Sequence, residues 1–235
     1  MLYYTCNPPV ASAAGREAVE RRPQLILAMK ANIYIDAFNL YYGCIKDTSF
    51  RWLDPRLLSE KLLPRHQVHR VRYFTARIQA RPTDPQAPQR QQTYIRALET
   101  IPGLTVHYGH FLSKATRMPL ARPPRRGPRT VEVLKTEEKG SDVNLATYLL
   151  LDAFDGDCEM ALVVSNDSDL VEPIRMVRAK FGLPVGVVNP QKTTSHALRQ
   201  AASFYRPLRQ GVLKASQLPT QLSDANGTII KPAAW

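Results

Sequence analysis

The sequence predicts an α/β fold with a mainly parallel central sheet, and three observations support this class. Apolar segments with the length and β-branched content of strands alternate with helical segments along most of the chain, which is typical of βαβ units. Acidic residues lie at or just beyond the ends of two of the predicted strands. The 235 residues, 44% of them hydrophobic, are enough for one globular domain with a sizeable core.

The first 28 residues show no clear periodicity and are rich in small residues, proline and charge. We expect residues 1–28 to be a disordered N-terminal extension. The apolar stretch at residues 25–28 is too short for a secretion signal, and Met29, directly before the first strand, is a candidate translation start. The main domain is expected over residues 30–205.

The first predicted strand is Asn32-Ile-Tyr-Ile-Asp36. The chain then turns away, which places Asn39 about one turn beyond Asp36 and close enough to share a site. A helical pattern follows over residues 52–63, with Asp54 as the expected N-cap and Pro55 in the first helical position.

Strands and helices continue to alternate in the middle of the chain. A strand is expected at residues 68–75, ending in Thr75, and a second strand at residues 104–112. The segment between them, residues 88–99, has the pattern of a helix. This order indicates βαβ units and places Thr75 at the same sheet edge as Asp36.

Residues 114–135 differ in kind from the segments on either side. Four prolines prevent a helix, and a single acid, Glu132, stands against seven basic residues. The basic residues are Lys114, Arg117, Arg122, Arg125, Arg126, Arg129 and Lys135. We expect a poorly ordered basic loop suited to follow a phosphate backbone; a merely solvated insertion is the alternative.

A strong helix is expected within residues 137–154. Gly140 and Ser141 form a turn that leaves Asp142 in the first helical turn, where the helix dipole favours a carboxylate. Asp142 is either only a cap or a third acidic position at the mouth of the fold, with the ammonium group of Lys139 beside it.

Residues 161–164 read as a buried strand that Asp167 and Asp169 follow directly. Ser168 or Asp169 can cap the helix that comes next. In an open α/β sheet, ligands bind beyond the carboxyl ends of the strands. Two carboxylates this close repel each other unless a cation, a proton or a basic group compensates them, which indicates a hard metal ion. The alternative is one capping aspartate and one solvated loop residue.

The remaining elements are a strand at residues 183–189, a short helix at 196–202 and an edge strand at 203–205. From Pro207 onward the hydrophobic pattern is lost. We therefore expect residues 206–235 to be a flexible C-terminal tail.

Composition narrows the partners. A formal net charge of +12 favours a polyanion, nucleic acid rather than a membrane surface, and no apolar run is long enough to cross a bilayer. Three cysteines without a CxxC pair indicate reduced thiols in the cytoplasm. The two His-x-x-His pairs lack neighbouring cysteine or carboxylate ligands, which argues against zinc.

Three motifs together resemble the NYN domain family of PIN-like nucleases, which includes the bacterial LabA-like (DUF88) proteins. They are Tyr34-Ile-Asp-Ala-Phe-Asn-Leu40, Lys139-Gly-Ser-Asp-Val-Asn-Leu145 and Val164-Ser-Asn-Asp-Ser-Asp-Leu170. The likeness covers about residues 30–205. It implies a PIN-like (Rossmann-like) three-layer sandwich and an acidic pocket that binds Mg²⁺ or Mn²⁺ to cut RNA.

The family's functional residues carry over by position. The matching acidic positions, which would bind the metal and catalyse the reaction, are Asp36, Asp142, Asp167 and Asp169. Asn39 matches the family's asparagine and is expected to act in catalysis by orienting a water or a metal ligand. Ser165 matches the small residue before the last acidic pair. Asn166 departs from the glycine or small residue that is common there, which affects the shape of the loop.

The function predicted from these observations is a metal-dependent ribonuclease that acts on RNA, single-stranded rather than structured, with a homodimer left open. Nucleic-acid contacts are expected from Lys139, Ser165, Thr75, Arg117, Arg122, Arg125, Arg126 and Arg129. An RNA-binding or regulatory module without turnover is the alternative. A haloacid dehalogenase phosphatase would need DxD after the first strand, and no GxGxxG follows a strand to suggest a dinucleotide.

Overall fold

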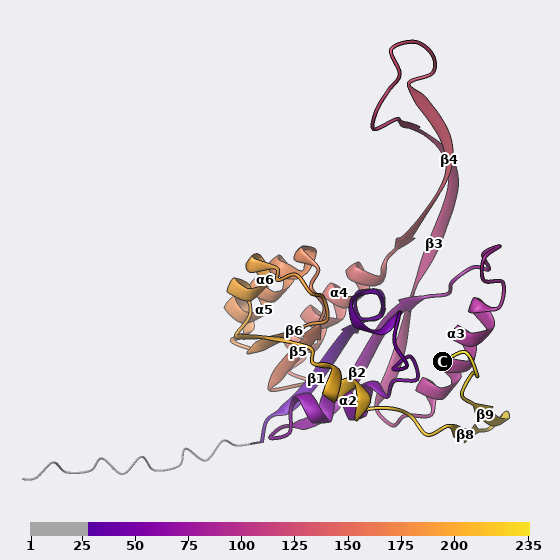
Figure 1. Ribbon diagram of the computed structural model, residues 1–235. Coiled ribbons are helices and arrows are strands. Elements are labelled where there is room, and N and C mark those ends of the chain that lie inside the picture. The colour runs from indigo at the N-terminus through magenta and orange to yellow at the C-terminus, as the bar shows by residue number, and fades with distance from the viewer. Residues whose placement is uncertain (1–27) are drawn as a thin grey trace, which may run out of the picture.

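The computed structural model describes residues 28–235 and contains a seven-stranded sheet (Figure 1). The expected extension at residues 1–28 lies outside the described residues except for its last position. The strands of the sheet are β1 (Lys30–Asp36), β2 (Gln67–Ala76), β3 (Leu104–Pro119), β4 (Thr130–Lys139), β5 (Met160–Val164), β6 (Val185–Asn189) and β7 (Phe204–Pro207).

The strand order is β4-β3-β2-β1-β5-β6-β7. Every neighbouring pair is parallel except β3 and β4. From β1 the chain adds strands on one side, and from β5 it adds them on the other. The strand order therefore reverses between β1 and β5, and this switch point is where open α/β sheets leave a crevice for a ligand.

Helices and short turns of helix cover both faces of the sheet. They are α1 (Ala37–Leu40), η1 (Tyr41–Ile45), α2 (Pro55–Leu62), α3 (Ala87–Glu99), α4 (Ser141–Phe154), η2 (Ser168–Leu170), α5 (Val171–Phe181), α6 (His196–Ala201) and α7 (Gln210–Lys214). Two separate hydrophobic clusters result, one with residues of α2, α3 and α7 and one with residues of α4, α5 and α6. The predicted three-layer α/β class is confirmed.

Strand β1 illustrates why a central strand is apolar on both sides. Ile33 and Ile35 point into the first cluster, whereas Tyr34 points into the second, and all three are fully buried. Successive side chains of a strand alternate between faces. A sheet covered on both faces therefore needs the continuous apolar run that the sequence shows.

A buried ion pair fixes helix α4 on the sheet. Arg72 of β2 contacts Asp152 of α4 at 2.6 Å, and the hydroxyl of Tyr34 donates to the same carboxylate at 2.7 Å. An Asp buried this deeply needs such partners. The position of α4 matters for function because its first turn carries Asp142.

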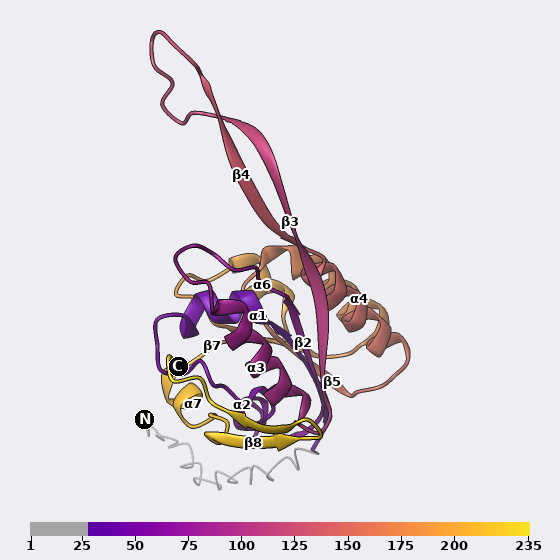
Figure 2. The ribbon, with the colours of Figure 1, turned by 90° about the vertical axis from the view of Figure 1, so that its right-hand side faces the viewer.

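The prediction of a basic loop at residues 114–135 was wrong, because most of this segment forms a two-stranded arm. β3 runs on to Pro119 and pairs with β4 in an antiparallel ladder from His110↔Lys139 to Pro119↔Thr130. The arm projects far from the body of the molecule in two perpendicular views (Figures 1 and 2). Prolines do exclude a helix here, yet three of the four lie in the loop at the tip and Pro119 ends β3, so they leave the ladder intact.

The predicted flexible tail was wrong for much of residues 206–235. This segment contains α7 and a small hairpin, β8 (Gln221–Asp224) and β9 (Gly227–Ile230). Leu213 and Ile229 are buried in the first cluster, and the ring of Trp235 packs 6.1 Å from that of Trp52. The C-terminal segment completes the core beside α2 and α3 (Figure 2).

The predicted cap of α2 is confirmed. The carboxylate of Asp54 accepts hydrogen bonds from the backbone amides of Arg56 and Leu57, and Pro55 takes the first helical position. None of the helices within residues 28–235 combines the length and apolar character that a bilayer span requires.

Candidate active site

Asp36 lies at the switch point of the sheet. It is the last residue of β1. The residue before it, Ile35, pairs with Val164 at the end of β5. The Asp36 carboxylate accepts a hydrogen bond from the Asn39 amide at 2.9 Å and so caps α1. Its side chain is only 5% exposed. The two strand ends therefore bring Asp36 next to the loop that carries Asp167 and Asp169.

Ser165 joins the two strand ends. Its hydroxyl donates to the second carboxylate oxygen of Asp36 at 2.9 Å and accepts from the Asp167 amide at 3.1 Å. Ser165 is fully buried, so it cannot contact a nucleic acid as predicted. A hydroxyl can donate and accept at once, and here it holds Asp36 and the start of the Asp167 loop in one arrangement.

Asp167 caps the turn that follows β5. Its side chain accepts from the Asp169 amide at 2.9 Å, which makes Asp167 the N-cap in place of the predicted Ser168 or Asp169. Asp167 is half-buried and Asp169 is exposed. One carboxylate therefore has a structural task as well as any chemical one.

Asn39 and Asn166 tie the active-site loops together. The side-chain oxygen of Asn39 accepts from the Asn166 amide at 3.1 Å and from the Gln191 side chain at 3.2 Å. Asn166 in turn accepts from the Tyr205 hydroxyl and from the Ser195 amide. The side chain that departs from the family pattern thus links β5 to the loop after β6 and to β7, which a glycine could not do.

Asp142 enters the site from the other side. It lies in the first turn of α4, after Gly140, whose φ of 96° is a left-handed conformation that favours glycine. Its predicted place at the mouth of the site is supported by its interactions: Asp36, Asp167 and Asp169 all lie near enough to raise its pKa.

Glu138 is an acidic residue of this site that the sequence analysis missed. It lies near the end of β4, accepts from the amide and hydroxyl of Ser141, and contributes to the raised pKa values of both Asp36 and Asp142. A Cβ on Gly109 would lie 2.3 Å from the Glu138 carboxylate, so only glycine allows this approach. The sequence analysis missed Glu138 because the pattern of this segment predicts a helix, whereas Glu138 lies near the end of a strand.

The carboxylates of this site strain one another electrostatically. Burial, together with the charges of Asp167 and Glu138, raises the pKa of Asp36 to about 6 although two hydrogen bonds oppose the shift. Burial and the neighbouring carboxylates raise the pKa of Asp142 to about 7. Uncompensated negative charge at a sheet edge is the property of a cation site.

The donor set fits a hard divalent ion in its chemistry. Carboxylate oxygens are the ligands that Mg²⁺ uses, usually one or two of them with several waters. No three His, Cys, Asp or Glu side chains within residues 28–235 are already gathered as a complete ligand set. The site is therefore suited to an ion held through a few carboxylates and water rather than to an all-protein cage.

The predicted nucleic-acid contacts fall into two groups. Thr75 is buried near the end of β2, so like Ser165 it is not available to a ligand. Lys139 is exposed at the base of the arm, where it is 3.5 Å from Glu137. The arginines lie on the arm and are exposed, away from the carboxylates: Arg117, Arg122, Arg125, Arg126 and Arg129.

Two phenylalanines pack against each other beside the acidic residues. Phe38 follows Asp36 in α1, and Phe111 lies directly across from Glu138 in the arm. Their rings meet edge to face with centroids 5.6 Å apart. Both rings are partly exposed and outside the two core clusters, which leaves an aromatic surface near the carboxylates.

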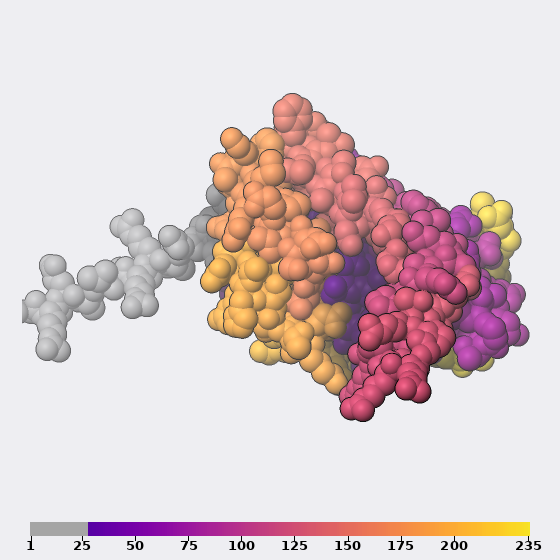
Figure 3. All heavy atoms as spheres, turned by 90° about the horizontal axis from the view of Figure 1, so that it is seen from above, coloured from indigo at the N-terminus to yellow at the C-terminus, as the bar shows by residue number. Residues whose placement is uncertain are grey.

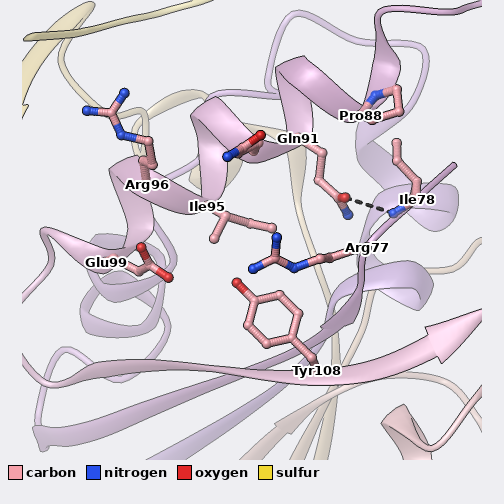
Figure 4. Close-up of a pocket in the computed structure, with 9 residues that line it drawn as sticks. Arg77, Ile78, Pro88, Gln91, Ile95, Arg96, Glu99 and Tyr108 are labelled. Carbon is pink, nitrogen blue, oxygen red and sulfur yellow. Dashed lines mark hydrogen bonds between the residues drawn. The ribbon is translucent and has the colours of Figure 1, made fainter. Parts of the chain in front are cut away.

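The site lies in an open hollow rather than a closed pocket. Seen from above, the indigo segment around β1 and α1 lies at the bottom of a depression between the orange α5–α6 region and the arm (Figure 3). A separate pocket lies between α3 and β3, where the guanidinium of Arg77 covers the ring of Tyr108 (Figure 4). That pocket contains none of the four predicted aspartates.

Acidic side chains at the switch point of a mainly parallel, doubly covered sheet define the architecture of PIN-like proteins. The family model of the NYN domain matches residues 30–209. The chain therefore belongs to the NYN domain family; the LabA-like subtype remains a prediction.

Two further comparisons give similar proteins. A protein of Pseudomonas putida (strain DSM 28022 / S16) named 6-hydroxy-3-succinoylpyridine 3-monooxygenase HspA is 32% identical over 237 residues, covering 88% of this chain and 75% of the relative. A crystal structure of VPA0982, a protein of unknown function from Vibrio parahaemolyticus RIMD 2210633, covers 80% of this chain and 97% of its own, with 19% identity and a TM-score of 0.49.

Proposed function

We propose that this protein is a metal-dependent ribonuclease that hydrolyses RNA phosphodiester bonds at the acidic site. The observation that carries the proposal is that Asp36 lies at the switch point, bonded through Ser165 to the loop of Asp167, while the charges of Asp36 and Asp167 help to raise the pKa of Asp142. Family membership supports a nuclease-type fold, and the strongly basic chain favours a polyanionic substrate.

A divalent ion, Mg²⁺ or Mn²⁺, would be held by Asp36, Asp142 and Asp167, with Asp169 at the exposed rim, and when bound it activates water and offsets charge on phosphate oxygens. The protein's own residues prepare this site. Ser165 and the Asn39 amide keep the Asp36 carboxylate in one orientation. Asn39 and Asn166 hold the loop that carries Asp167.

The basic arm supports the choice of a nucleic acid. Its base, Lys139, is only three residues from Asp142, so a strand bound along the arm reaches the carboxylates. Phe38 and Phe111 offer a surface on which a base can stack, an interaction that tolerates any sequence. An open hollow with stacking rings suits single-stranded RNA, whose unpaired bases are free to stack on aromatic side chains.

The test is to incubate the purified protein with labelled single-stranded RNA, structured RNA and DNA, each with Mn²⁺, Mg²⁺ or EDTA. Cleavage of RNA that requires the metal and stops with EDTA is the expected result. RNA that is bound but never cut under any metal condition would instead support a binding or regulatory module with the same fold.

A second candidate is an enzyme that acts on a small heteroaromatic ring. The relative that is 32% identical is named a monooxygenase of 6-hydroxy-3-succinoylpyridine, and the rings of Phe38 and Phe111 could contact a pyridine as well as a base. The same purified protein is offered hydroxypyridines and nicotinamide or flavin reductants, and oxygen consumption is followed. Substrate-dependent oxygen uptake would favour this candidate; its absence beside RNA cleavage would favour the nuclease.

A further inference from the structure

The arm formed by β3 and β4 from Ser113 to Thr136 has several features that destabilise it as an isolated ribbon. A two-stranded ribbon that packs on nothing else is only marginally stable in water. Lys114 and Lys135 lie directly across from each other, and like charges in that position are destabilising. Leu112 and Leu134 are 47% and 74% exposed. These features indicate a segment made to contact a partner.

The unbalanced positive charge lies at the tip of the arm. Along the ladder, Arg117 is across from Glu132, and Lys135 and Lys139 are both near Glu137. The loop at residues 120–129 has no acid at all. Its four arginines are Arg122, Arg125, Arg126 and Arg129. A polyanion is therefore attracted most strongly to the tip.

The base of the arm is fixed to the site. Glu138 accepts two hydrogen bonds from Ser141, and the side chain of Asn144 donates to the carbonyl of Tyr108 at 3.2 Å. The start of α4 is thus attached to both strands of the arm. The distance from tip to carboxylates is consequently set by the length of the ladder.

Ten residue pairs make up the ladder between His110↔Lys139 and Pro119↔Thr130. At about 3.4 Å per residue the arm holds its tip roughly 30 Å from the site. This length corresponds to about nine stacked nucleotides at about 3.4 Å each. An RNA must therefore be about that long to touch the tip arginines and the acidic site together.

We propose that the arm is a spacer: its tip anchors the RNA backbone, and its length sets how far from the anchored phosphates the acidic site acts. This inference rests on the proposed function for the contact between RNA and the acidic site and for the cut itself. It predicts a substrate of about nine nucleotides or more, which excludes a small molecule as the ligand of the arm.

The test changes the length of the arm without changing its tip. Removing residues 113–116 and 133–136 deletes four facing pairs and keeps the alternation of faces, because the number is even. The shortest single-stranded RNA that binds at full strength, measured by fluorescence anisotropy with Ca²⁺ in place of Mn²⁺ so that the charge of the carboxylates is compensated, should fall from about nine to about five nucleotides. With Mn²⁺, the cleavage position should move toward the anchored end by about four nucleotides.

The matched control keeps the arm at full length but makes the double change Lys114→Gln and Lys135→Gln, since the deletion also removes these two charges. It should bind more weakly, with the same length threshold. If the shortened protein does not fold, replacing the four tip arginines by glutamine gives the same information. Long and short RNAs should then bind equally.

An unchanged threshold in the shortened protein, or a threshold that survives loss of the tip arginines, would overturn the spacer. Failure of the proposed function looks different. In that case the binding threshold moves as expected but no metal produces cleavage. Cleavage together with an unchanged length threshold would support the nuclease and contradict the spacer.

Discussion

At the scale of single residues, the site depends on side chains that have two tasks. Ser165 donates to Asp36 and accepts from the Asp167 amide. Asp167 caps a turn, and its charge also helps to raise the pKa of Asp142. Removing such a residue changes position and charge together. Variants must therefore be compared with controls that make the same chemical change elsewhere.

Ser165→Ala should lower the free energy of unfolding at pH 8. The buried Asp36 carboxylate loses one of its two hydrogen-bond donors, and leaving a buried charge short of a partner costs about 1–3 kcal/mol or more. The free energy of unfolding, measured with urea, checks this. Ser168→Ala, at an exposed serine nearby, is the control and should change little. Equal stability of the two variants would contradict the assigned bond.

The raised carboxyl pKa values predict the sign of a pH dependence. Asp142 shifts from 3.8 to about 7, so the folded protein holds this proton more tightly than the unfolded chain does. Its contribution to stability is therefore complete at pH values below 3.8 and is lost as pH rises toward 7. In EDTA, the Asp142→Asn variant should gain stability relative to wild type as pH rises through this range. A parallel pair of pH curves would contradict the shift.

The sequence indicated most of the acidic site. Asp36 and Asp167 end or follow strands that local patterns identify, so their shared edge could be predicted. Glu138 and Gln191 could not, because Glu138 requires the pairing of β4 with β3 and Gln191 contacts Asn39 across 152 positions. The burial of Thr75 was equally hidden, since it depends on what covers the sheet.

At the scale of elements, the C-terminal hairpin gives a matched pair of variants. Ile229 is 1% exposed and packs in the first core cluster, whereas its neighbour Ile230 is 65% exposed. Ile229→Ala should cost about 2–5 kcal/mol. Ile230→Ala should change stability by less than about 0.5 kcal/mol. The measurement is urea unfolding. Small effects of both substitutions would contradict the packing of residues 206–235 in the core and favour the flexible tail.

The elements that were predicted well are those with strong local signals. β1, β5 and α2 have continuous apolar runs or a complete cap, which neighbouring residues alone determine. The arm and the C-terminal hairpin were missed because their strands are short of apolar residues and gain stability from pairing or from contacts such as Trp235 with Trp52. Such contacts leave no period in the sequence.

At the scale of the whole molecule, the charge of the chain should govern RNA binding. A basic side chain that neutralises a phosphate releases counterions, so affinity falls with salt. Replacing the arginines at positions 122, 125, 126 and 129 by glutamine should lower the slope of log affinity against log salt by about 0.7 for each phosphate that is no longer neutralised. The control replaces four basic residues of the body: Arg65, Lys61, Arg175 and Lys180. Equal slopes in both variants would place RNA elsewhere than the arm.

The overall architecture followed from the alternation of strands and helices and from family motifs, and the strand order then explains why the site is where it is. Strands added on opposite sides of β1 and β5 leave their carboxyl ends uncovered. No residue-level signal shows this. It becomes visible only when all seven strands are placed.

The most direct test of the account compares cleavage of single-stranded RNA by wild type, Asp167→Asn and Asp155→Asn in the presence of Mn²⁺. Asn keeps the capping ability of Asp167, so the variant should fold. Asp155 caps the far end of α4 and is exposed, which makes it the matched control. The account predicts metal-dependent cleavage by wild type and Asp155→Asn and none by Asp167→Asn. Undiminished cleavage by a folded Asp167→Asn protein would contradict it.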